Sequence, residues 1–143
     1  MRNAPRKFAF MSRAGKTGLK SVDDPLEAGA ILMVLIAGAH TGRGLAPEQE
    51  RVIQAEAQKV FELSSADAAD LMTHAVWMVR DVDLVSGVVL RMTQVIKQAP
   101  GIGAAELVDL HEILEAVSTA LGEPDAEQAR ILELYRNKVG MTV

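Results

Sequence analysis

The chain has 143 residues, of which 49% are hydrophobic, and it contains no cysteine. This length is close to the commonest size of a single domain and is sufficient to bury a sizeable core. Disulfides, thiol catalysis and zinc–thiolate sites are excluded, and a chain without cysteine suits the reducing cytoplasm, where we expect it to act. Metal ligands would have to be carboxylates or the three histidines, His40, His74 and His111.

The net charge of −4 conceals an uneven distribution along the chain. Residues 1–22 contain six of the fifteen Lys and Arg residues and no Asp or Glu, so the remaining residues carry nine basic and nineteen acidic side chains. We predict a basic, flexible leader over 1–22 and one acidic helical domain over 23–143. An acidic domain is not expected to bind nucleic acid, because it repels phosphate.

The first predicted helix is an apolar run that begins at Pro25 and continues to about His40. Asp24 before Pro25 is a typical helix start, with an acidic N-cap and a proline in the first turn. The uncharged stretch Ala28–Ala39 is twelve residues long, whereas a membrane-spanning helix needs about twenty. Because the run is apolar on nearly all sides, it predicts a buried helix at the centre of the domain.

Five further segments show apolar residues at helical spacing. The fourth of the six helices is rich in β-branched residues, which also suit a strand, but its length without a turn signal favours a helix. No alternating runs remain for a sheet, so the predicted class is all-α, a compact orthogonal bundle of about six helices. The five later helices are predicted at about Pro47–Leu63, Ala66–Val79, Asp81–Ile96, Ala104–Leu121 and Ala126–Lys138.

Two corners of the chain match when the sequence is shifted by 79 residues. The shift places residues 48–53 on residues 127–132, and both segments read Glu-Gln-x-Arg-apolar-apolar. It also brings the apolar run ILMVLIAGA close to ILEAVSTAL. The match suggests two related helix-corner-helix pairs, with coincidence as the alternative.

These pairs, with the middle segment DVDLVSGVVLRMTQVI and the later segment AAELVDLHEILEAVSTALGEPDAEQARILELY, resemble the tellurite-resistance TerB-like family, particularly its stand-alone bacterial members. The resemblance covers about Pro25 to Met141. It implies a compact all-helical domain linked to tellurite or chemical-stress systems at the membrane. It also implies corners that usually read Ala-Asp-Gly-x-apolar, with a glutamate four positions later, whose carboxylates suit a calcium-type metal.

The two corners of this sequence lack those acids. Gly42 and Leu121 stand where the family pattern has aspartate, and Gln49 and Gln128 stand where it has glutamate. Arg43 adds a repelling positive charge to the first corner. Carried over residue by residue, the resemblance therefore predicts a degenerate metal site, and we expect no bound metal or cofactor.

The other candidate contact residues each have a structural alternative. His40, in the last turn of the first predicted helix, is a candidate ligand, but histidine there commonly meets the carbonyl end of the helix dipole. His111 and Glu115 lie one turn apart in an H-E-x-x-E string, which lacks the second histidine of a zinc protease and equally fits a solvated acidic face. Arg43 is a candidate anion contact, although the acids at the next helix start occupy the phosphate position.

No serine, histidine and acid lie at a recognisable hydrolase spacing, so we expect no enzyme activity. The favoured interpretation is a cytoplasmic, non-enzymatic accessory module that binds a protein partner. The alternative is a helical protein that binds a small ligand or a metal through the three histidines or through a methionine-lined interior. The residues considered for that interior are Met72, Met78, Met92 and Trp77.

The basic leader contains Phe8, Phe10 and Met11 among its Lys and Arg residues. Disorder is one interpretation of such a segment. The alternatives are that it folds back on the bundle, makes a weak contact with an anionic membrane surface, or helps to hold the second subunit of a homodimer.

Overall fold

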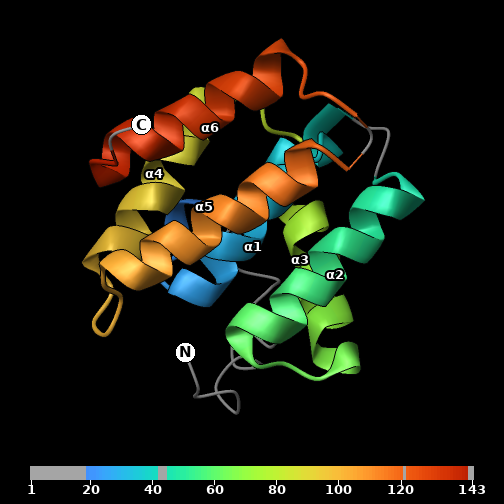
Figure 1. Cartoon of the computed structure of the whole chain (residues 1–143), viewed down its shortest axis with the longest axis horizontal. Coiled ribbons are helices and arrows are strands. Elements are labelled where there is room, and N and C mark those ends of the chain that lie inside the picture. The colour runs from blue at the N-terminus through green and yellow to red at the C-terminus, as the bar shows by residue number, and fades with distance from the viewer. Residues whose placement is uncertain (1–18, 42–44, 121, 142–143) are drawn as a thin grey trace.

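The computed structural model describes residues 19–41, 45–120 and 122–141, and Figure 1 shows them as a bundle of α-helices without a strand. This confirms the predicted all-α bundle of six helices. In chain order, the elements are η2 (Leu19–Ser21), α1 (Pro25–Ile36), η3 (Ala39–Thr41), α2 (Pro47–Phe61), α3 (Ser65–Val79), α4 (Val85–Gln98), α5 (Ala104–Ser118) and α6 (Ala126–Val139).

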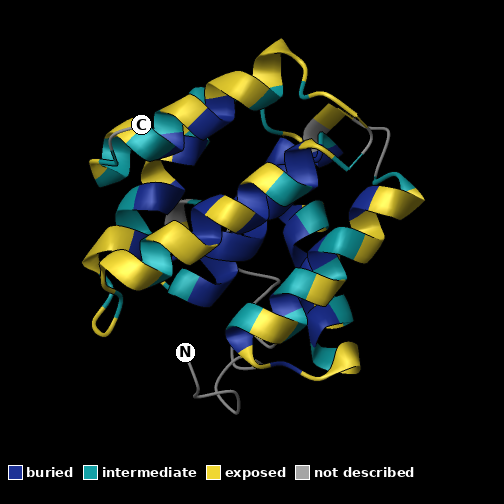
Figure 2. Cartoon of the chain, in the orientation of Figure 1, coloured by how far each residue is buried: buried dark blue, intermediate teal, exposed yellow. Residues whose placement is uncertain are grey.

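The core is built around α1, as the apolar run predicts. Every residue from Leu26 to Ile36 is buried, and α1 packs against all five other helices. In Figure 2 the interior of the bundle is dark blue, while the outer helices turn their yellow faces outward. None of the described helices has the length and apolar character needed to cross a bilayer.

The ends of several helices follow signals that are local in the sequence. The backbone N–H of Leu26 donates to Oδ1 of Asp24 at 2.9 Å, which caps α1 directly before Pro25. Ser64 caps α3 through a bond from the N–H of Asp67 to its hydroxyl oxygen. Gly140 ends α6 in the left-handed conformation with a φ of 81°.

Three predicted helix boundaries are wrong by a few residues. The first helix ends at Ile36 rather than near His40, because Gly38 takes a φ of 89° that glycine adopts easily, and the chain then turns into η3. The fourth helix begins at Val85 rather than Asp81, after a turn. The fifth ends at Ser118, whose hydroxyl donates back to a carbonyl of the last turn and so satisfies part of the helix end.

The first residues of the helices follow the 79-residue shift that relates the two helix-corner-helix pairs in the sequence. The helix α5 begins 79 residues after α1, and α6 begins 79 residues after α2. The two pairs therefore keep the same spacing as the short sequence match. Between them, α3 and α4 pack on either side of the same central helix, since both make extensive contacts with α1.

Tyr135, the only tyrosine in the chain, joins the two helices of the second pair. Its side chain is completely buried on α6, and its hydroxyl donates to the backbone carbonyl of Leu107 on α5 at 2.7 Å. Burial raises the pKa of Tyr135 above the ordinary value for tyrosine. The neutral phenol is therefore strongly favoured in the native protein.

We expect the absorbance change at 295 nm that reports tyrosine ionisation to occur at a higher pH in the native protein than in urea. Above a pH of about 10 the unfolded chain loses the phenol proton while the native chain keeps it, so the free energy of unfolding should fall as the pH rises. The variant Tyr135→Phe should abolish the absorbance change and weaken the pH dependence. A native-state midpoint equal to that in urea would contradict the burial argument.

Candidate functional site

The two helix corners meet in space. The side-chain amide of Gln128, at the start of α6, donates from Nε2 to the backbone carbonyl of Ile36 at 2.9 Å. A cavity of about 540 Å³, the corner cavity, lies between the end of α1, the start of α2, the end of α5 and the start of α6. The residues that line it include Ile36, Ala37, Gly38, Thr41, Leu45, Ala46, Pro47, Gln49, Ser118, Glu123, Asp125, Glu127 and Gln128.

Both corner glutamines are used to hold helix starts. The carbonyl oxygen of the Gln49 side chain accepts from the N–H of Ala46 at 3.3 Å, and that of Gln128 accepts from the N–H of Asp125 at 3.0 Å. At the second corner the bond is reciprocated, because the backbone N–H of Gln128 donates to Oδ1 of Asp125 at 2.8 Å and completes a capping box. At the first corner only the bond to Gln49 forms, since the alanine at the N-cap has no side-chain acceptor. At Gln128 an amide is required in addition, because a carboxylate cannot donate to the Ile36 carbonyl and would be repelled by it.

We expect Gln128→Glu to lower the free energy of unfolding by about 1–3 kcal/mol at pH 7, the usual cost of leaving a buried or half-buried polar group without its partner. The loss should be smaller at pH 4, because a protonated carboxyl group can donate to the Ile36 carbonyl. Urea titrations followed by circular dichroism would measure both values. The matched variant Gln94→Glu, on half-buried α4 surface, should cost less, and equal losses would argue against a special role of Gln128.

The other corner positions named from the sequence are Gly42, Arg43 and Leu121, and all three lie outside the described residues. His40 belongs to η3, but its side chain also lies outside what the structure describes. The two glutamines are therefore the corner positions for which side-chain contacts are known. Their contacts assign both side chains to helix capping.

A pair of polar side chains lies buried in the core. Glu27, in the first turn of α1, is 3% exposed, and His74, on α3, is 4% exposed. The Nε2 atom of His74 lies 2.5 Å from Oε2 of Glu27. The sequence shows that Glu27 is an acid within an otherwise apolar helix, but it does not indicate that His74 is its partner. The pair links the central helix to α3.

His111 has different partners. Its Nε2 lies 3.3 Å from Nη1 of Arg136, its ring stacks on Tyr135, and its Nδ1 lies 3.8 Å from Oε1 of Glu115. The described histidines His74 and His111 therefore serve separate helix contacts. Within the described part of the chain, no three His, Cys, Asp or Glu side chains gather in a way that would hold a metal ion.

The methionines of the proposed apolar interior are buried members of the hydrophobic core, at positions 72, 78 and 92. Trp77 does not share their environment, since it is 49% exposed and the guanidinium of Arg80 lies over its ring at 4.3 Å. The spacing along α3 turns Met72 and Met78 inward and Trp77 outward, and Met92 is buried on α4. Core packing accounts for the three methionines.

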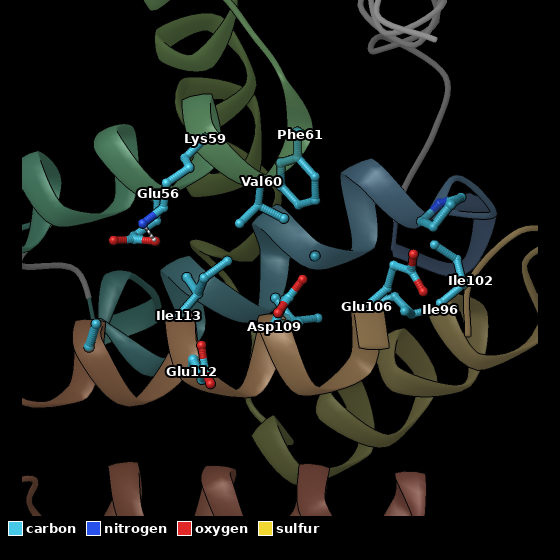
Figure 3. Close-up of a pocket in the computed structure, with 14 residues that line it drawn as sticks. Glu56, Lys59, Val60, Phe61, Ile96, Ile102, Glu106, Asp109, Glu112 and Ile113 are labelled. Atoms are coloured by element: carbon cyan, nitrogen blue, oxygen red, sulfur yellow. Dashed lines mark ion pairs between the residues drawn. The ribbon is translucent and has the colours of Figure 1, made fainter. Parts of the chain in front are cut away.

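A second cavity, of about 510 Å³, is an open groove between α2 and α5 with α1 at its floor, here termed the acidic groove. Figure 3 shows the acids along α5 and the pair formed by Glu56 and Lys59 on α2. The lining residues are Pro25, Gly29, Glu56, Lys59, Val60, Phe61, Ile96, Ile102, Glu106, Asp109, Leu110, Glu112, Ile113 and Ala116. Four of these side chains are acidic and one is basic.

The acids of the groove owe their alignment to helical spacing. Glu106, Asp109 and Glu112 recur every three residues on α5 and so occupy one face of that helix. Glu106 is fixed further because its Oε1 accepts from the N–H of Gly103 at 2.8 Å, and this bond lowers the pKa of its carboxyl group. The carboxylate is therefore ionised at neutral pH. Helical spacing alone does not indicate that α2 lies opposite these acids.

The apolar floor depends on a close approach between α1 and α2. A Cβ atom built on Gly29 would lie 3.1 Å from Cζ of Phe61, which is tighter than ordinary van der Waals contact. Glycine at this position lets the Phe61 ring rest directly on α1. Val60 and Ile113 contribute further apolar surface from the two walls.

The described residues form a small all-α bundle, and its acidic groove combines an apolar floor with acidic side chains on the walls. Comparisons of the chain with protein-family models, with curated proteins and with solved structures find no match. The resemblance to the TerB-like family therefore stays a prediction from the sequence.

Proposed function

We propose that the protein is a non-enzymatic binding module whose acidic groove receives a basic, apolar-anchored segment of a protein partner. The carrying observation is the combination, in one groove, of an apolar floor with four carboxylates and a single lysine. That lysine, Lys59, lies 3.6 Å from Glu56, so it offsets one of the acids. The remaining acids leave the groove negatively charged.

The two parts of the groove have different roles in binding. Its volume falls within the range of about 300–1,000 Å³ that is usual for sites that enclose a ligand. Burial of one large apolar side chain on the floor contributes about 1.5–3 kcal/mol of affinity. The carboxylates speed the approach of Lys- and Arg-rich segments and reject acidic ones. This selectivity also agrees with the expectation that the folded domain does not bind nucleic acid.

The wider role rests on the sequence resemblance. A TerB-like module would act as an accessory protein in a cytoplasmic response to tellurite or chemical stress at the membrane, and the proposed partner would belong to that system. Native mass spectrometry would test the ligand-binding alternative, because a small molecule or metal that stays bound to the protein would favour it.

A peptide pair tests the groove directly. The probe is a synthetic peptide with two Leu anchors one helical turn apart and four Lys residues, and its control carries Glu in place of each Lys. In ¹H–¹⁵N spectra we expect the Lys peptide to shift the amides of groove residues such as Asp109, Glu112 and Val60. The Glu peptide should shift none of them. Equal binding of both peptides, or shifts confined to another surface, would contradict the proposal.

Neutral variants provide a second arm. In a chain that also carries Arg6→Gln, Lys7→Gln and Arg13→Gln, which removes most of the basic charge of the leader from the comparison, the double variant Asp109→Asn and Glu112→Gln should weaken binding of the Lys peptide by about tenfold, which corresponds to the loss of about 1.4 kcal/mol. A control with the same change of net charge is Glu123→Gln with Glu133→Gln, since both side chains are exposed and neither lines the groove. That control should bind the Lys peptide with the same affinity as the chain without these two changes.

A further inference from the structure

The occupant of the acidic groove can be sought within the chain itself. Residues 1–18, which lie outside the described part, hold five Lys and Arg residues, no acid, and the apolar side chains Phe8, Phe10 and Met11. The groove carries four acids and an apolar floor. The two surfaces are therefore complementary both in charge and in apolar character.

The chain joins the bundle beside the groove. Pro25, at the start of α1, lines it, and Leu19 lies six residues upstream. The segment between them is held to the bundle, since Val22 is buried and Nε of Arg91 donates to the carbonyl of Leu19 at 3.3 Å. Six residues span at most about 20 Å, so residues 1–18 begin within a short distance of the groove.

The length outside the described part is sufficient to follow the groove. Eighteen residues reach about 60 Å when extended. The helix α5, which forms one wall, has 15 residues and is therefore about 22 Å long at the usual rise of an α-helix. An extended segment of seven or eight residues covers that wall, so the part from Arg6 to Arg13 is enough to bring Phe8 and Phe10 to the floor.

We propose that residues 1–18 bind the acidic groove of their own chain and compete there with the partner segment. This inference rests on the proposed function of the groove and identifies how it is regulated. A short tether gives the leader an effective concentration in the millimolar range, so even weak contacts keep the groove largely occupied. The partner then binds with an affinity reduced in proportion to the fraction of free groove.

The absence of cysteine allows a single spin label to be placed in the full chain through Ser12→Cys. Amides of groove residues such as Glu56, Asp109 and Glu112 should lose signal intensity, and reduction of the label should restore it. The variant Asp109→Asn with Glu112→Gln should also restore intensity, whereas Glu123→Gln with Glu133→Gln should not. Full intensity at the groove in the labelled parent chain would overturn the proposal.

A mixing experiment separates the leader of the same chain from that of a second copy. Spin-labelled chain without ¹⁵N is added to ¹⁵N-labelled chain without the spin label. Unchanged intensity in the mixture supports binding within one chain. Loss of intensity at the groove in the mixture assigns the contact to a second copy and overturns the proposal as stated.

Competition is measured with the Lys peptide on the full chain. The variant Arg6→Gln, Lys7→Gln, Arg13→Gln should bind this peptide about tenfold more tightly than the parent, as expected if the leader fills the groove nine-tenths of the time. If the parent and the triple variant bind the peptide equally tightly, and the spin label causes no loss of intensity at the groove, the leader does not occupy the groove. The proposed function of the groove is unaffected by that result. If the peptide binds neither chain, while the spin label also leaves the groove unaffected, both proposals fail.

Discussion

Replacing Glu27 with alanine is expected to lower the free energy of unfolding by about 3–5 kcal/mol, because removal of one member of a buried polar pair leaves the other without its partner. Glu27 and His74 are both almost fully buried, and their side chains meet at 2.5 Å between α1 and α3. Replacement of His74 with alanine should have a comparable cost, since the polar side chain of Glu27 would then stay buried without the imidazole contact. Urea unfolding followed by circular dichroism at 222 nm measures both effects.

A double replacement distinguishes a polar requirement from a packing requirement. Buried polar pairs can often be exchanged for apolar residues of similar volume at little cost. We therefore expect Glu27→Met with His74→Phe to recover most of the stability that either alanine variant loses. Glu133→Ala, at an exposed position of α6, serves as the control and should change stability by less than about 0.5 kcal/mol. Losses in the single variants that match this control would contradict the importance of the pair.

The helices could be predicted because their signals are local. Asp24 followed by Pro25 marks the start of α1, and twelve uncharged residues after it mark a helix buried on all sides. Gly140 marks the end of α6. The boundary near His40 was misplaced because the apolar pattern continues beyond Gly38, whose positive φ ends the helix. An apolar pattern indicates which residues are buried, and buried residues such as Ala37 and Ala39 continue beyond the end of the helix.

The contacts that define the candidate sites could not be predicted in the same way. Gln128 and the Ile36 carbonyl lie 92 positions apart, and Glu27 and His74 lie 47 positions apart. Helical periodicity states which side of a helix is buried but not which helix covers it. For that reason helical spacing aligns the acids of α5 on one face but does not indicate that α2 forms the opposite wall of the groove.

The repeat gave the most useful indication of long-range structure. A 79-residue shift that matches only a few residues also relates the starts of two helix pairs. The side-chain carbonyls of its two glutamines accept equivalent bonds, from the N–H of Ala46 and from the N–H of Asp125. The amide of Gln128 also donates to the Ile36 carbonyl, and this bond joins the second corner to the first. The bond to the Ile36 carbonyl thus gives glutamine at position 128 a structural reason, since a glutamate there could not donate it.

The replacement Phe61→Ala is expected to lower the free energy of unfolding by about 3–5 kcal/mol, the usual cost of removing a buried aromatic side chain and leaving a cavity. Phe61 ends α2 and is buried against α1, with Cζ 3.1 Å from the position of a Cβ on Gly29. The groove would lose part of its apolar floor with the ring. Urea unfolding gives the change in stability, and titration with the Lys peptide gives the change in affinity.

A double-mutant cycle with Gly29→Ala tests the direct contact. Alanine is favoured over glycine within a helix by about 1 kcal/mol, but in the parent protein the added methyl group meets the Phe61 ring and the gain should be reduced or reversed. In the Phe61→Ala background the same methyl group enters free space, so the full gain should appear. The expected coupling is about 0.5–2 kcal/mol, as for other residues in contact.

The matched control is Gly87→Ala on α4, where an added Cβ has no neighbour within 4 Å among the described residues. This substitution should stabilise the protein by a similar amount with and without Phe61, since the two positions share no contact. If Gly29→Ala stabilises the parent protein as much as Gly87→Ala does, then the ring does not rest on α1. Glycine at position 29 would then be unnecessary for the floor of the acidic groove.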